Sequence, residues 1–149
     1  MNLTFSELYT EVFSVFSFQV ERVLYSGRSP FQKIEVVESK AFGKVLLIDD
    51  LVMLTERDEF VYHEMIAHVP LFTHPDPREV LIIGGGDGGT VRECLKHPGV
   101  QRIDLVDIDE MVSQACLKYI PSVAQGLLSE RVNCRFQDGV EYVRTTDRR

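Results

Sequence analysis

The sequence predicts an α/β protein in two parts, a small antiparallel β domain followed by an incomplete doubly wound parallel sheet. Residues 18–54 contain short extended stretches separated by turn residues, which is typical of β-hairpins. From Val80 onward, short apolar strands alternate with helical stretches, which is typical of a parallel sheet with crossover helices. The polar, proline-containing stretch 73–78 lies between them, so we expect two domains, 1–73 and 74–149.

Hairpins and one helix are expected in the first domain. Ser26-Gly27 and Ser29-Pro30 are turn candidates, and Asp49-Asp50 is another between two short apolar runs. Thr55 is the expected N-cap of a helix over about 55–72, because acidic residues follow in the first turn, where they complement the helix dipole. The expected strands are 18–25, 31–38, 44–48 and 51–54.

The second domain is expected to contain three parallel strands with helices between them. The first strand, 80–83, is a continuous apolar run that ends in glycines, as expected of a strand buried on both faces. The other expected strands are 102–107 and 132–136. The expected helices are 89–97, 110–119 and a last one from residue 139 onward.

Composition argues against several classes of protein. The 149 residues carry 16 basic and 23 acidic side chains, a net charge of −7, so no nucleic-acid partner is expected. No apolar run approaches the roughly 18 residues of a membrane span, so no membrane association is expected. Cys94, Cys116 and Cys134 form no CxxC pair and predict reduced thiols in a cytoplasm. No metal site is expected either, since His63 and His68 do not share one helical face.

A glycine-rich loop joins the first parallel strand to the helix that follows. Gly84, Gly86 and Gly89 fit the GxGxxG pattern, and such a loop lets a ligand approach the backbone closely. Asp107 stands at the carboxyl end of the next strand, where an acidic side chain can bind ribose hydroxyls. We infer a nucleoside-containing ligand; a tight turn packed against the helix is the alternative.

Asp87 lies inside this loop and indicates the kind of ligand. A carboxylate there repels a pyrophosphate and attracts a cation, so the pattern fits an S-adenosyl compound better than a dinucleotide. The alternative is a turn residue that satisfies backbone amides. Asp138, before Gly139, could accept from an adenine amino group or cap the last helix. Tyr62 and His63 could face a substrate or could be packing residues.

Together these residues resemble the spermidine synthase family of polyamine aminopropyltransferases. The resemblance implies a methyltransferase-like Rossmann domain after the β domain. It also implies transfer of an aminopropyl group from decarboxylated S-adenosylmethionine to putrescine, giving spermidine and methylthioadenosine, with no cofactor besides this co-substrate. The matching segments are GRSPFQ (27–32), LTERDEFVYHEM (54–65), VLIIGGGDGG (80–89), VDIDE (106–110) and Asp138-Gly139.

The resemblance also assigns residues to the two substrates and implies a homodimer or larger homo-oligomer. The residues implied in donor or methylthioadenosine binding are Gln32, Gly84, Gly86, Asp107, Asp138 and Gly139. The residues implied in amine binding are Tyr62, His63 and Asp87. The resemblance places the amine-activating aspartate beyond Arg149, so no catalytic residue is expected within this chain.

The chain departs from the family pattern at Asp107, where glutamate is usual, and at Met53, where glutamine is usual. Three functions stay open. The chain could be the front half of an aminopropyltransferase, a non-catalytic nucleoside-binding or regulatory subunit, or a methyltransferase, and the segment 54–65 argues against the last. The acceptor could be putrescine, cadaverine or a longer amine.

Overall fold

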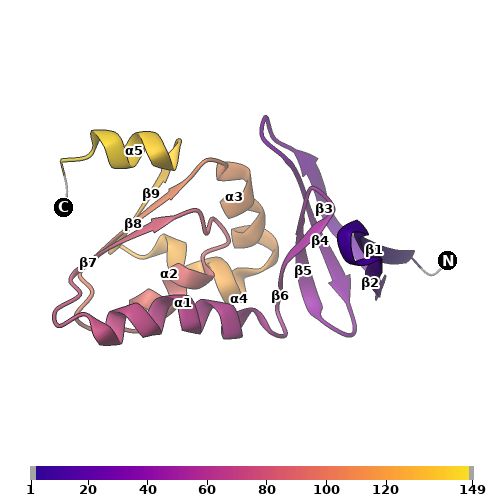
Figure 1. Ribbon diagram of the computed structural model, residues 1–149, viewed down its shortest axis with the longest axis horizontal. Coiled ribbons are helices and arrows are strands. Elements are labelled where there is room, and N and C mark those ends of the chain that lie inside the picture. Colours follow the sequence, from indigo (N-terminus) through magenta and orange to yellow (C-terminus); the bar gives the residue numbers. More distant parts are fainter. Residues whose placement is uncertain (1–2, 148–149) are drawn as a thin grey trace. The chain divides into compact units, whose positions relative to one another are not determined.

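The computed structural model describes residues 3–147 of the chain (Figure 1). The chain divides into two compact units, Met1–Glu59 and Phe60–Arg149. This division comes earlier than the expected boundary at 73/74. The difference is helix α1 (Glu59–Thr73), which belongs to the second unit except for Glu59. Ion pairs join its two histidines, His63 and His68, to carboxylates of that unit.

Antiparallel strands make up the first unit. A two-stranded hairpin, β1-β2, and a four-stranded sheet of order β3-β4-β5-β6 form it, with a core of Phe18, Val20, Val37, Val45 and Leu47. A short 3-10 helix, Thr10–Val12, joins the first two strands. The strands are β1 (Leu3–Tyr9), β2 (Ser14–Val20), β3 (Arg22–Arg28), β4 (Lys33–Ser39), β5 (Gly43–Ile48) and β6 (Leu51–Thr55).

The turn predicted at Asp49-Asp50 is confirmed. Both residues have positive φ, 48° and 64°, and Ile48 pairs with Leu51, which is the geometry of a two-residue hairpin. The Asp49 side chain supports the turn by accepting a hydrogen bond from the Lys33 amide at 2.8 Å.

Two expectations for this unit are wrong, one undivided strand over 18–25 and a turn at Ser26-Gly27. The predicted strand 18–25 is divided at Glu21 between β2 and β3, which belong to different sheets. Gly27 is not in a turn; it pairs with Ile34 inside β3. A Cβ at Gly27 would collide with the Tyr25 side chain, so this glycine makes room for a neighbouring ring rather than for a bend.

A parallel three-stranded sheet of order β7-β8-β9 forms the centre of the second unit, and the predicted fold class is confirmed. Figure 1 shows α5 across this sheet from α1, α2 and α4. The strands are β7 (Glu79–Ile83), β8 (Arg102–Asp107) and β9 (Val132–Phe136). Besides α1, the helices are α2 (Gly89–Leu95), α3 (Glu110–Tyr119), α4 (Pro121–Ala124), a 3-10 helix (Gln125–Leu128) and α5 (Gly139–Thr145).

Helix α1 begins at Glu59 rather than at Thr55. Thr55 ends strand β6, and its hydroxyl donates to the Asp58 carboxylate at 2.6 Å, so it does not act as the expected N-cap. The helix continues through Pro70 to Thr73. Across residues 3–147, no helix is both long and apolar enough to cross a membrane.

Candidate functional site

The candidate site lies in the second unit, where strands β7 and β8 end. Gly84, Gly85 and Gly88 have φ of 79°, 74° and 87°, a region that favours glycine. The Gly84 amide donates to the Val106 carbonyl at 2.8 Å, and the Gly88 amide donates to the Gly85 carbonyl at 2.9 Å. The loop is therefore a hydrogen-bonded bend that continues the pairing of the two strands.

Asp107, the last residue of β8, holds this loop in place. Its Oδ2 accepts a hydrogen bond from the Gly86 amide and its Oδ1 accepts one from the Asp109 amide, both at 2.9 Å. A Cβ on Gly86 would lie 2.9 Å from the same Oδ2, so only glycine lets the carboxylate come this close. Each carboxylate oxygen has a second lone pair, which leaves the half-buried side chain able to accept from a ligand hydroxyl.

His63 and Asp87 form an ion pair beside the loop. His63 Nε2 lies 3.1 Å from Asp87 Oδ1, and the same oxygen accepts a hydrogen bond from the Gly89 amide at 2.8 Å. Burial by itself would raise the pKa of Asp87, but the contacts with His63 and the Gly89 amide outweigh it and hold the pKa below its usual value. Asp87 is therefore an anion at neutral pH.

Gly89 and Tyr62 complete the surroundings of this pair. A Cβ on Gly89 would overlap the His63 ring, so the absence of a side chain there admits the imidazole. The His63 side chain is buried, whereas Tyr62 is 62% exposed, with its ring 5.3 Å from the His63 ring in an edge-on arrangement. His63 is thus packed in the unit and aimed at Asp87, and Tyr62 is open to solvent.

The third expected position, Asp138-Gly139, follows strand β9. Asp138 caps α5, because its Oδ1 accepts from the amides of Val140 (2.7 Å) and Glu141 (3.0 Å). The helix cap, one of the two roles expected of Asp138, is therefore present, and the exposed carboxylate remains open to solvent as well. A Cβ on Gly139 would lie 2.7 Å from Ile83, the last residue of β7, so Gly139 lies close to the start of the glycine loop.

Gln32 belongs to the first unit. It closes the turn between β3 and β4, where its carbonyl accepts from the Ser29 amide at 2.9 Å and its own amide donates to Ser29 Oγ at 3.1 Å. This turn was predicted from Ser29-Pro30, and it fixes the backbone of Gln32.

Two residues of the site region were given no role from the sequence. Ser113 on α3 donates to the Gly86 carbonyl at 2.8 Å, and Asp109 caps α3 by accepting from the Met111 amide at 3.0 Å. The cap had a local signal, an aspartate directly before an acidic first turn. Ser113 had only a weak one, a small polar residue among the apolar side chains of a helix.

Comparison with known protein families gives two matches that together cover nearly the whole chain. Residues 59–149 match the spermine/spermidine synthase domain, and residues 4–56 match the spermidine synthase tetramerisation domain. These matches confirm the resemblance expected from the sequence, and they indicate that the first unit is of a kind that takes part in oligomerisation.

Curated relatives support the same assignment. A polyamine aminopropyltransferase from Methanocaldococcus jannaschii is 50% identical over 133 residues, 89% of this chain and 45% of the relative. One from Clostridium botulinum (strain Eklund 17B) is 48% identical over 147 residues, 99% of this chain and 51% of the relative. The chain thus spans about half the length of the curated relatives it matches.

Solved structures agree in fold. The spermidine synthase from Thermotoga maritima superposes with a TM-score of 0.93 at 45% identity, over 95% of this chain and 50% of that one. A spermidine synthase in complex with the transition-state analogue AdoDATO gives the same TM-score and identity, over 48% of its own chain. The methyltransferase-like fold expected for the second unit is confirmed by this agreement.

Proposed function

Because the chain belongs to the spermine/spermidine synthase family, we propose that it supplies the donor-binding part of a polyamine aminopropyltransferase. The reaction moves an aminopropyl group from decarboxylated S-adenosylmethionine to putrescine and yields spermidine and methylthioadenosine. The observation that carries the proposal is Asp107, an acidic side chain hydrogen-bonded to the glycine loop at the carboxyl end of β8.

The donor side of the site is the loop and the two strand ends next to it. Asp107 binds the ribose hydroxyls through its remaining lone pairs, and the glycines at 84 and 86 let the nucleoside approach the backbone. Asp138 and Gly139 bind the adenine edge. Gln32 is assigned to the same nucleoside by the family resemblance alone.

The amine side is built around Asp87. Its carboxylate is held ionised, and both His63 and the Gly89 amide contact the same oxygen, Oδ1. We assign the amine substrate and the cationic aminopropyl end to this carboxylate, with Tyr62 at the exposed rim. A donor that still carried its own carboxylate would be repelled here, so the site selects the decarboxylated compound.

Transfer itself is a displacement at the carbon next to the sulfonium. The nitrogen of a deprotonated amine forms the new bond to carbon while the carbon–sulfur bond breaks, and methylthioadenosine leaves with the electron pair. The residues described above bind and orient the two partners, which lowers the entropic barrier to their meeting. We assign no general base to residues 3–147.

Calorimetric titration with methylthioadenosine tests the donor site directly. We expect Asp107→Ala to weaken binding by about 2 to 4 kcal/mol, the value of one or two charge-assisted hydrogen bonds. Asp76→Ala, which removes an exposed aspartate that pairs with Arg78, serves as the matched control and leaves affinity unchanged. Unchanged affinity in a folded Asp107→Ala chain would refute the ribose assignment.

The amine assignment needs its own test. With methylthioadenosine bound at saturation, titration with putrescine is expected to show that Asp87→Asn loses most of the binding, because the diamine loses its charged partner. Binding of the nucleoside should persist in this variant. Equal putrescine affinity in both proteins would remove Asp87 from the amine site.

Two further properties follow from the same proposal. We infer self-association as a homodimer or larger homo-oligomer through the first unit, where Leu8, Val12, Phe13 and Val15 expose apolar side chains around the β1-β2 turn. Analytical ultracentrifugation of Phe13→Asp is expected to show smaller species than the parent chain. We also propose a reducing, cytoplasmic setting, because all three cysteines are free thiols.

A further inference from the structure

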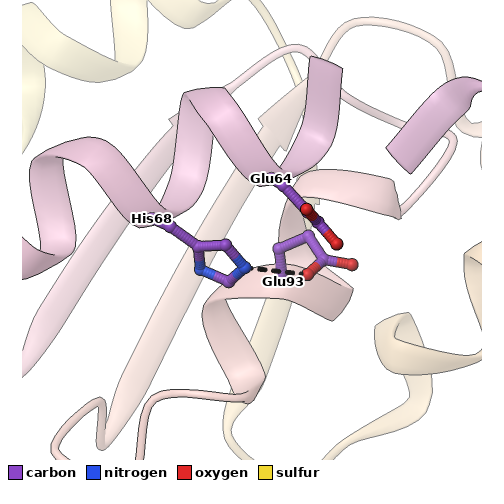
Figure 2. A group of neighbouring side chains, drawn as sticks. All are labelled: Glu64, His68 and Glu93. Atoms are coloured by element: carbon purple, nitrogen blue, oxygen red, sulfur yellow. Dashed lines mark ion pairs between the residues drawn. The ribbon is translucent and has the colours of Figure 1, made fainter. Parts of the chain in front are cut away.

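Three side chains at the contact between α1 and α2 face one another (Figure 2). Glu64 and His68 stand four residues apart on α1, so they lie on the same face of that helix, and Glu93 reaches them from α2. One ligand atom from each residue lies within 4.8 Å of the other two, and His68 Nε2 is 3.1 Å from Glu93 Oε2. None of the three belongs to the site proposed above.

Glu93 is the unusual member of this group. Its side chain is completely buried, and its Oε1 accepts a hydrogen bond from Arg92 Nε at 2.8 Å. Its Oε2 accepts no aligned hydrogen bond among residues 3–147, although the Lys96 ammonium lies 2.5 Å away. The buried Oε2 of Glu93 therefore has a cation, the Lys96 ammonium, as its neighbour but no aligned hydrogen bond.

The orientation of His68 adds a second, independent observation. Its Nδ1 lies 2.8 Å from His97 Nε2, so one of these two nitrogens donates to the other. His68 Nε2 lies 3.1 Å from Glu93 Oε2 on the other side of the ring. In the tautomer in which Nδ1 carries the proton, the lone pair of Nε2 points at Glu93 Oε2, and a metal ion can bind both atoms.

His97 lies on the other side of the His68 ring from Glu93. Its Nε2 is 2.8 Å from His68 Nδ1, where it can accept a hydrogen bond from that nitrogen. Histidines that bind metals commonly donate their second ring nitrogen to an outer partner, which fixes the tautomer. His97 is placed to serve as this outer partner of His68.

We propose that Glu64, His68 and Glu93 form a binding site for a divalent transition metal, with Zn²⁺ as the ion best suited to one imidazole and two carboxylates. Three protein ligands leave a fourth tetrahedral position, and the exposed Glu64 side of the cluster gives water access to it. The imidazole ligand argues against Ca²⁺ and Mg²⁺, because these ions prefer oxygen ligands.

Lys96 competes with the metal for the same oxygen. Its side chain is half exposed, so the ammonium can move into solvent when an ion enters. Arg92 stays on the other oxygen of Glu93 and keeps part of the negative charge neutralised. The metal thus replaces a mobile cation and ties α1, which carries His63, to α2, which follows Asp87.

The sequence offered no sign of this site. The expectation of no metal rested on the spacing of cysteines and histidines, whereas two of these three ligands are glutamates. Glu64 and Glu93 come together only because α1 and α2 pack against each other.

The test is titration of the metal-free chain with ZnCl₂ by calorimetry at neutral pH, with bound metal checked by elemental analysis. We expect one Zn²⁺ per chain and a rise in the melting temperature when it binds. Glu64→Gln and His68→Gln are expected to weaken binding by about 100-fold or more, given that even outer partners of metal ligands contribute about 10- to 100-fold. Lys96→Met is expected to strengthen it.

Matched controls separate this site from unspecific binding. Glu130→Gln and His74→Gln remove an exposed glutamate and an exposed histidine outside the cluster, and they should bind Zn²⁺ as the parent chain does. Glu64 is exposed, so its variant is expected to fold even if changes at the buried Glu93 do not. Absence of one-to-one binding, or equal loss in the control variants, would overturn the proposal.

Discussion

Helix α1 carries two histidines that each meet a carboxylate, and the two pairs differ in what surrounds them. His63 meets Asp87 at the glycine loop, and His68 meets Glu93 inside the α1–α2 contact. The side chain of Asp87 keeps 19% of its surface exposed, whereas that of Glu93 keeps none and is flanked by Arg92 and Lys96. The same pairing thus leaves one carboxylate partly exposed to solvent and buries the other beside protein cations.

The two ion pairs of α1 suit different roles, ligand binding and stability. At the loop, the partner histidine keeps an accessible carboxylate ionised and oriented, which suits binding of a cationic substrate. In the helix contact, the carboxylate has several positive neighbours and binds the two helices together. We therefore expect changes at Glu93 to affect stability most and changes at Asp87 to affect binding most.

The largest expected effect is at the enclosed pair. Glu93→Gln should lower the free energy of unfolding by about 2 to 3 kcal/mol, because Arg92, Lys96 and His68 lose the buried anion around which they are arranged. Urea denaturation followed by circular dichroism measures this, with Glu130→Gln as an exposed control expected within about 0.5 kcal/mol of the parent. A loss no larger than that of the control would mean that the buried charge contributes nothing.

A substitution at Gly89 tests the open pair by crowding it. Gly89→Ala places a methyl group on the His63 ring, and overpacking of this kind costs about 1 to 3 kcal/mol. Gly99→Ala is the matched control, because the nearest atom to its added Cβ is 3.9 Å away. If both alanines melted alike, the close fit of His63 against the loop would be contradicted.

The pH dependence of Asp87 gives the next expected effect. Because the pKa of Asp87 in the folded state lies below its usual value of 3.8, the unfolded chain takes up this proton first as the pH falls. The stabilisation is complete above about pH 4 and is lost below it. Asp87→Asn should therefore be about 1 to 2 kcal/mol less stable near neutral pH, with the difference shrinking in acid.

The smallest effect is expected at His97, on the far side of the enclosed pair. Burial lowers the pKa of His97 below its usual 6.5, so stability is complete above that pH and declines as the pH falls toward the folded-state pKa. His97→Gln should change stability at pH 8 by less than about 1 kcal/mol and should flatten the profile below pH 6.5. Urea unfolding between pH 5 and pH 8 measures both effects. If the free energy of unfolding of His97→Gln fell with pH as steeply as that of the parent chain, His97 would not be the group responsible.

Local patterns predicted the parts of this molecule that depend on neighbouring residues in the chain. The glycines of the loop, Asp107 at a strand end and the Asp49-Asp50 turn all carry their own backbone requirements, so sequence reasoning located them. For Asp138 the sequence left two roles open, a helix cap and a contact with adenine, because a carboxylate suits both.

Features that depend on tertiary packing were missed or misplaced. Three of these features arise only when elements distant in the chain meet. They are the contact of Ser113 with Gly86, the partners of Glu93 and the assignment of α1 to the second unit. Thr55, followed by acidic residues, has the local pattern of a helix N-cap, but it pairs with Val45 in the four-stranded sheet and ends strand β6.

The order of pairing in the two sheets also bears on how quickly each can form. In the first unit, β5 and β6 close over a two-residue turn, so Ile48 and Leu51 meet with little loss of chain entropy. In the second, Glu79 must find Arg102 across a loop and a helix before β7 and β8 can pair. Folding rate falls as contacts become less local, so the antiparallel sheet is expected to form first, with the parallel sheet as the slower step.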